Sequence, residues 1–157
     1  MSLKTLNDLF EIAIEHEISS QKFYQDALES TQDPKVQHFL RTLIAEEKGH
    51  EKMLKSIAEM EIYDGTVPVS HDVLEHARQS HDIDIPELSA DPSLDEIYEI
   101  ALKRETKAYN LFIQMSMTTV NPELKTLFGN LAEEEQTHHK NIDTAYQINT
   151  GEMGYEG

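Results

Sequence analysis

The sequence repeats itself once, at a constant offset of 88 residues and without gaps. Thr5 matches Ser93, and the break at Asp33-Pro34 matches the break at Asn121-Pro122. Helix starts, helix breaks and apolar positions all recur together, which indicates two copies of one helical hairpin related by a pseudo-twofold axis. The repeat therefore predicts an all-α fold, a four-helix bundle built from two hairpins in a single domain.

Apolar residues at helical spacing predict four long amphipathic helices, over residues 6–31, 34–61, 94–119 and 122–148. Thr5 with Asp8 and Ser93 with Glu96 have the spacing of capping boxes. The stretch between the pairs, residues 62–93, is too long for a tight turn and predicts a crossover along the bundle, with a short helix over residues 71–80. The apolar stripe of the second helix comprises Val36, Phe39, Leu40, Leu43, Met53, Leu54 and Ile57.

Composition excludes several classes of function. The chain has 13 basic and 30 acidic residues, a formal net charge of -17 and no cysteine. The missing thiols exclude disulfides, zinc–thiolate sites, iron–sulfur clusters and a cysteine nucleophile. The acidic excess argues against nucleic-acid binding. No apolar run is long enough to span a bilayer, and the first residues lack the hydrophobic region of a signal peptide, so we expect a cytoplasmic protein without membrane association.

Polar residues interrupt each apolar stripe near the middle of its helix. The first hairpin has one glutamate on its first stripe and a Glu-x-x-His on its second, and the offset of 88 finds the same set in the second hairpin. A spacing of three places that glutamate and histidine on one face of the helix. The six residues are Glu17, Glu47, His50, Glu105, Glu135 and His138.

Four carboxylates facing one bundle centre are costly, because burial and mutual repulsion both oppose ionisation. Two divalent cations would supply four positive charges against them, and two imidazoles would complete the ligand set. Oxygen-rich, nitrogen-poor ligands suit iron or manganese better than copper or structural zinc. The pattern therefore predicts a dinuclear metal site, with two iron ions as the first expectation and manganese as the alternative.

Four segments carry a resemblance to a known family: EHEISSQKFY, IAEEKGHEKM, KRETKAYNLF and LAEEEQTHHK. They resemble the ferritin-like superfamily, most closely its rubrerythrin/erythrin branch of di-iron carboxylate proteins. The resemblance implies a ferritin-like bundle in which Glu47 and Glu135 bridge the two metals. It also implies terminal carboxylates at Glu17 and Glu105, with nitrogen ligands at His50 and His138.

The same comparison suggests residues that support the ligands. Tyr24 lies two turns beyond Glu17 and would donate to a bridging carboxylate, and Glu46 and Glu134 would each orient the histidine of the opposite half. Phe112 stands at the position symmetric to Tyr24, so that role belongs to one side.

Two features depart from rubrerythrins. The chain lacks the four cysteines of a rubredoxin domain, so an electron donor must be another molecule. Ala108 stands where rubrerythrins have an extra glutamate that takes part in a redox-linked metal shift.

The function expected from the resemblance is that of a dinuclear non-haem redox protein, a ferroxidase or peroxidase that oxidises Fe(II) with O2 or reduces H2O2, and that forms a homodimer. Three alternatives remain open at the level of sequence. They are an iron storage or delivery component of a larger assembly, a di-manganese catalase-like protein, and a metal-free helical binding module. The remaining histidines are expected outside the centre, at the surface or in the crossover: His16, His38, His71, His76, His81 and His139.

Overall fold

The computed structural model describes residues 4–83 and 85–150, and the side chains of all of these except 78–83, 149 and 150. The described residues form five helices: α1 (Leu6–Ser30), α2 (Pro34–Ala58), α3 (His71–Ile83), α4 (Leu94–Thr118) and α5 (Pro122–Thr150). The all-α prediction is confirmed. Compared with the predicted bounds, the second long helix ends three residues earlier, at Ala58, and the crossover helix extends to Ile83.

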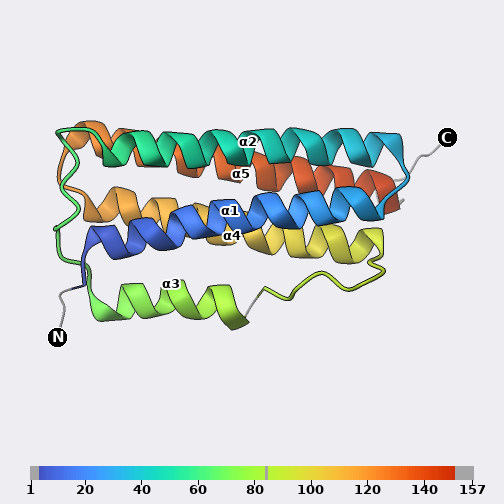
Figure 1. The fold of residues 1–157 in the computed structure, drawn as a ribbon, viewed down its shortest axis with the longest axis horizontal. Coiled ribbons are helices and arrows are strands. Elements are labelled where there is room, and N and C mark those ends of the chain that lie inside the picture. The colour runs from blue at the N-terminus through green and yellow to red at the C-terminus, as the bar shows by residue number, and fades with distance from the viewer. Residues whose placement is uncertain (1–3, 84, 151–157) are drawn as a thin grey trace.

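The four long helices form two hairpins that pack side by side. α1 pairs with α2 and α4 with α5, and the hairpins meet through α1 and α4, while α3 packs on the outside against α1 and α4 (Figure 1). The crossover carries the chain back along the bundle, so that α4 runs in the same direction as α2. The backbones of α2 and α5 stay further apart than those of the other neighbouring pairs.

Side-chain caps fix where the helices begin. The backbone N–H of Thr5 donates to Asp8 Oδ2 at 2.8 Å, which forms the predicted capping box of α1. Ser93 accepts from the N–H of Glu96 at 3.1 Å, but the Glu96 carboxylate accepts from Ser89 instead of completing a second box. That part of the prediction is wrong because Ser89, in the crossover, offers both its N–H and its hydroxyl to the same carboxylate.

Asp33 and Asn121 cap the second helix of each hairpin. Asp33 accepts from the N–H of Lys35 at 2.9 Å, and Asn121 accepts from the N–H of Glu123 at 2.8 Å. Each cap precedes a proline that occupies the first helical position, where a missing N–H costs nothing. The two sharp turns therefore sit at equivalent places in the repeat.

The start of the crossover is tied to the start of α1. The N–H of Leu6 donates to Val67 O at 2.8 Å, and the N–H of Val69 donates to Lys4 O at 2.9 Å. Gly65 accepts from the N–H of Asn7 at 3.0 Å, and a Cβ at Gly65 would collide with the Asn7 side chain. The close approach of these two segments explains a glycine at this position.

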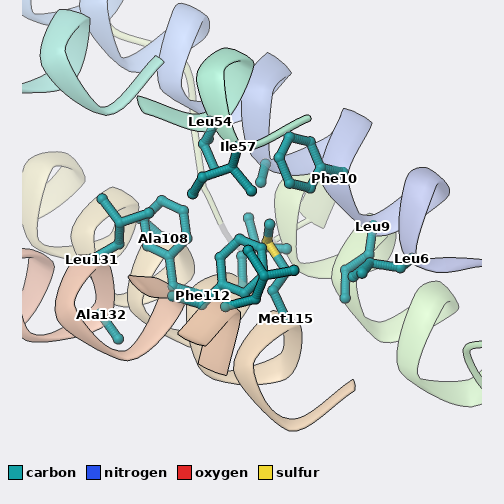
Figure 2. Close-up of a cluster of buried hydrophobic side chains, with 14 of the residues drawn as sticks. Leu6, Leu9, Phe10, Leu54, Ile57, Ala108, Phe112, Met115, Leu131 and Ala132 are labelled. Atoms are coloured by element: carbon teal, nitrogen blue, oxygen red, sulfur yellow. The ribbon is translucent and has the colours of Figure 1, made fainter. Parts of the chain in front are cut away.

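The apolar core consists of two clusters, one toward each end of the bundle. The first cluster, shown in Figure 2, includes Phe10, Leu54, Ile57, Phe112, Met115 and Phe128. The second includes Tyr24, Leu40, Leu43, Ile97, Tyr98 and Ile142. The helices are continuous through both clusters, so the polar side chains at mid-helix lie between two packed cores. None of the helices described here is both long and apolar enough to cross a membrane.

Phe128 offers a direct test of the first cluster. It is 0% exposed and packs edge-on against Phe10 with ring centroids 6.0 Å apart. We expect Phe128→Ala to lower the free energy of unfolding by about 3–5 kcal/mol, because it removes a buried ring and leaves a cavity. Urea denaturation measures the change. Val120→Ala, at a residue 72% exposed, is the control and should stay within about 0.5 kcal/mol of the wild type.

Candidate metal centre

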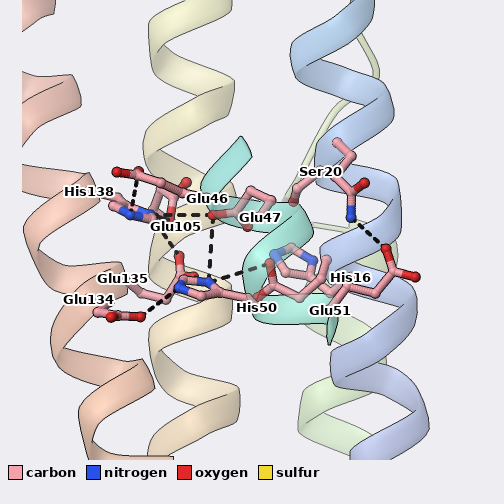
Figure 3. A network of polar contacts seen from close by, with 12 residues as sticks. His16, Ser20, Glu46, Glu47, His50, Glu51, Glu105, Glu134, Glu135 and His138 are labelled. Carbon is pink, nitrogen blue, oxygen red and sulfur yellow. Dashed lines mark hydrogen bonds and ion pairs between the residues drawn. The ribbon is translucent and has the colours of Figure 1, made fainter. Parts of the chain in front are cut away.

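The six residues singled out in the sequence converge at the middle of the bundle. Glu17 comes from α1. Figure 3 shows Glu105 on α4 and the glutamate and histidine that α2 and α5 each contribute. All six side chains are buried, and the histidines, at 6% exposure, are the most accessible of the set. The structure therefore brings together every residue predicted to hold metal: Glu17, Glu47, His50, Glu105, Glu135 and His138.

These side chains form two overlapping groups that could each hold an ion. The first group is Glu17, Glu47, His50 and Glu135, and the second is Glu47, Glu105, Glu135 and His138. Within each group the candidate ligand atoms all lie within 4.8 Å of one another. Both groups contain Glu47 and Glu135. Two carboxylates shared between two groups are placed to bridge two ions, whereas each remaining glutamate and histidine belongs to one group only.

Each imidazole directs one ring nitrogen toward the buried carboxylates of the centre and the other ring nitrogen away from the centre. Nδ1 of His50 lies 2.5 Å from Glu135 Oε1, and Nδ1 of His138 lies 3.3 Å from Glu47 Oε1. The two rings stack, with centroids 5.5 Å apart and planes 13° apart. Nδ1 is therefore the nitrogen on each ring that is placed to bind an ion.

The outward nitrogens meet carboxylates of the opposite hairpin. His50 Nε2 lies 2.8 Å from Glu134 Oε2, and His138 Nε2 lies 2.6 Å from Glu46 Oε2. A carboxylate at Nε2 favours the tautomer that carries its proton there, which leaves the Nδ1 lone pair free for a metal. Glu46 and Glu134 are thus positioned as orienting partners, and their reciprocal pairs connect α2 to α5.

Tyr24 contacts the cluster at one corner only. Its hydroxyl donates to Glu105 Oε1 at 2.6 Å. Glu105 belongs to the second group alone, so the expected donation to a shared, bridging carboxylate is wrong. The difference depends on the relative rotation of α1 and α4, which helix periodicity does not specify. Phe112, at the symmetric position, instead packs edge-on against His50 with centroids 6.1 Å apart.

Burial and crowding shift the acidity of the cluster. Burial, and then the charge of Glu47, raise the pKa of Glu17 well above its usual value. Burial, and then the charges of Glu105 and Glu47, do the same for Glu135. Burial also acts to raise the pKa of Glu105, but its close contacts with Glu135, His138 and Tyr24 outweigh it and leave that pKa lowered. The carboxylates therefore cannot all be ionised together without added positive charge.

Eight polar atoms in this cluster lack a hydrogen-bond partner of ordinary geometry. They are Glu17 Oε1 and Oε2, Glu47 Oε1, His50 Nδ1, Glu105 Oε2, Glu135 Oε1 and Oε2, and His138 Nδ1. Buried polar atoms are normally paired, because an unpaired one keeps its full desolvation cost. All eight are oxygen or nitrogen atoms that can act as metal ligands, and they face one another. The residues present therefore fit a pair of divalent cations.

Comparison with known proteins agrees with this geometry. The sequence matches the rubrerythrin family over residues 2–58 and 61–146. The chain belongs to the rubrerythrin family. The resemblance seen in the sequence is thereby confirmed, with a Glu/His cluster consistent with a dinuclear metal site. No curated protein sequence matches the chain significantly.

Two solved structures share the fold. A candidate ferritin-like diiron-carboxylate protein from Thermotoga maritima is 15% identical, with a TM-score of 0.69, and the match covers 94% of this chain and 97% of that one. A hypothetical protein from Pyrococcus furiosus is 23% identical, with a TM-score of 0.67 and coverage of 91% and 89%. The ferritin-like fold of this rubrerythrin-family chain is therefore confirmed.

The sequence analysis missed two residues beside the centre, buried His16 and half-buried Arg104. His16 was expected at the surface, but it is 1% exposed, and its Nε2 lies 2.9 Å from the carbonyl oxygen of Arg104. Arg104 donates to the hydroxyls of Ser19 and Ser20 at 3.0 and 3.2 Å. His16 and Arg104 are repeat equivalents that meet where α1 packs on α4. The signal was present, since His16 lies three residues after buried Ala13.

The other histidines lie outside both groups. His38, His71 and His76 are exposed, as predicted, and His139 is half-buried without joining the cluster. The side chain of His81 lies outside the described residues.

Metal-free protein should become less stable as the pH rises from about 6.5 to about 9. Burial acts to lower the pKa of His50, but Glu135, Glu47 and Glu134 together raise it to about 9 from 6.5. The stabilisation from this proton is complete below pH 6.5 and is lost as the pH rises through 9. The raised pKa values of Glu17 and Glu135 act in the same direction.

We expect a decrease of about 1–3 kcal/mol in the free energy of unfolding, measured by urea denaturation in the presence of a chelator. The decrease should be smaller in His50→Gln. A free energy of unfolding that rises over this pH interval would contradict the assignment.

Proposed function

We propose that this chain is a dinuclear non-haem metal redox protein, with iron as its metal, that oxidises Fe(II) with O2 or reduces H2O2. The observation that carries the proposal is the pair of buried Glu/His groups that share Glu47 and Glu135. Oxygen-rich ligands with one nitrogen per ion suit iron and manganese. The description of the Thermotoga protein as a candidate diiron-carboxylate protein favours iron.

Within this proposal the six residues divide into two roles. Glu47 and Glu135, which belong to both groups, would bridge the ions. Glu17 with His50 would complete one coordination shell, and Glu105 with His138 the other. Four carboxylates would then balance the four charges of two divalent ions, which would remove the repulsion that, together with burial, raises the pKa of Glu17 and Glu135.

When bound, a pair of ferrous ions would supply the two electrons that, with two protons, reduction of H2O2 to water requires. The chain's own residues would hold and shield the ions. Glu46 and Glu134 would fix the imidazole rings, and the Tyr24 hydroxyl would hold Glu105 in place at 2.6 Å. The apolar clusters at both ends of the site exclude water along the bundle axis. Electrons for turnover would come from an external donor, and we expect the chain to act as a homodimer.

The ligand roles predict how metal content changes with single substitutions. Wild-type protein should bind about two ions per chain. Glu47→Gln should lose both because it removes a ligand common to both groups, whereas Glu17→Gln should lose or weaken one. Elemental analysis and native mass spectrometry after loading with Fe(II) under argon measure the content.

The control is Glu133→Gln, at an exposed residue two positions from Glu135. It should retain both ions. A wild-type chain that binds neither iron nor manganese would sink the proposal and favour a metal-free binding module.

The redox reaction is tested by mixing Fe(II)-loaded protein with O2 or with H2O2. Ferric absorbance should appear with at least one oxidant in wild-type protein and much more slowly in Glu47→Gln, which lacks the paired site. The faster oxidant separates a ferroxidase from a peroxidase. No acceleration over free Fe(II) with either oxidant would contradict the proposal.

Two further measurements address the remaining alternatives. Oxygen release from H2O2 by manganese-loaded protein without added reductant would indicate a catalase-like protein instead. A solution mass near that of a dimer would count against an iron-storage shell made by this chain.

A further inference from the structure

A groove between α2 and α5 leads from the surface to the two imidazoles. It has a volume of about 750 Å³, and the rings of His50 and His138 form part of its lining. Its walls carry three exposed carboxylates and one glycine, contributed by Glu46, Glu133, Glu134 and Gly49. The groove exists because α2 and α5 stay further apart than the other neighbouring helices.

The other sides of the centre are closed by packed side chains. Toward α1 and α4, Ser20 and Tyr24 are fully buried, and Arg104 lies over the Phe23 ring at 5.1 Å from its centroid. The two apolar clusters fill the bundle at either end. A larger hollow of about 1100 Å³ lies between α3 and α4, but none of the six centre residues lines it. Of these two hollows, the α2–α5 groove is the one that reaches the centre.

From its rim to the centre, the groove offers a cation a series of possible ligands whose solvent exposure decreases step by step. Glu46 and Glu134 have side chains 43% and 59% exposed, and each contacts an imidazole that is itself 7% exposed. Those imidazoles in turn contact Glu47 and Glu135, which are buried. An ion can therefore exchange water for ligands stepwise instead of losing its hydration at once, and the acidic rim attracts cations toward the opening.

Gly49, on α2, is part of the lining of this groove. A Cβ built at Gly49 has nothing within 4 Å, so the backbone here borders empty space. The repeat equivalent of Gly49 is Thr137, which lines the opposite wall. One wall thus carries no side chain at the position where the other carries a threonine.

We propose that divalent metal ions enter and leave the centre through the α2–α5 groove, with Glu46 and Glu134 as the first protein ligands and Gly49 as the residue that keeps the opening clear. This inference rests on the proposed metal centre. It adds a route, and it assigns Glu46 and Glu134 a second role beyond orienting the histidines.

The test measures metal exchange kinetics with Co2+ alone, without any redox step. Uptake by metal-free protein is followed by the visible absorbance of bound Co2+, and release is followed after excess chelator is added. Gly49→Leu, which projects a side chain into the groove, should slow both uptake and release by about tenfold or more, a barrier increase of about 1.4 kcal/mol. The number of ions bound at equilibrium should not change, because no ligand is altered.

Gly129→Leu provides a matched control. Gly129 is also a glycine inside a helix with nothing within 4 Å of its Cβ, but it does not line the groove. Both substitutions improve helix propensity equally, so any general stiffening of the protein affects both variants. Gly129→Leu should exchange Co2+ at the wild-type rate, and Gly49→Phe should be slower than Gly49→Leu.

The outcomes distinguish failure of the proposed entry route from failure of the proposed metal centre. If Gly49→Leu exchanges Co2+ at the wild-type rate, or if Gly129→Leu slows as much, the route is wrong while the centre stands. If wild-type protein binds no Co2+, Fe(II) or Mn(II), the metal centre itself is wrong.

Discussion

The constraint on which this structure depends is the repulsion among four carboxylates buried at one level of a helical bundle. Glu17, Glu47, Glu105 and Glu135 are each at most 1% exposed. Water cannot screen them there, so their charge must be balanced by protons, by neighbouring cations or by bound metal. The surrounding residues supply part of this balance. Two imidazoles face the carboxylate oxygens, and the Tyr24 hydroxyl donates to an oxygen of Glu105. A buried carboxylate cluster with so few hydrogen-bond partners adds little to the stability of the fold, but it is well suited to bind cations.

The pseudo-twofold repeat explains both the completeness of the cluster and its asymmetry. Duplication supplies each hairpin with the same glutamates and histidine, so two groups arise from one local pattern. The symmetry is broken at pairs that surround the cluster, among them Tyr24/Phe112 and His16/Arg104. A hydroxyl reaches Glu105, while no equivalent donor reaches Glu17 from Phe112. Two ions held here would therefore have different surroundings and could differ in reactivity, although their ligand sets are equivalent.

The sequence was informative wherever one helix determines the outcome. Caps at Asp33 and Asn121, the helix breaks, and the Glu-x-x-His spacing are local, and the repeat made each visible twice. The wrong predictions near the centre depend on how helices are rotated against each other. His16, predicted at the surface, is 1% exposed, and Met53, predicted on the core stripe, is 42% exposed and lines the groove. Similarly, the partner of Tyr24 is chosen by the packing of α1 against α4, which no single-helix pattern encodes.

The division of the core into two clusters allows a costly centre to persist. Phe10, Phe112 and Phe128 pack on one side of it, and Leu40, Ile97 and Ile142 pack on the other. Because most apolar burial lies in these clusters, folding does not require the centre itself to be favourable. Metal binding would then add stability to a bundle already held by its apolar clusters, instead of creating the fold as it does in small zinc domains. Such a site could exchange its ions without unfolding, in keeping with the proposed route through the groove between α2 and α5.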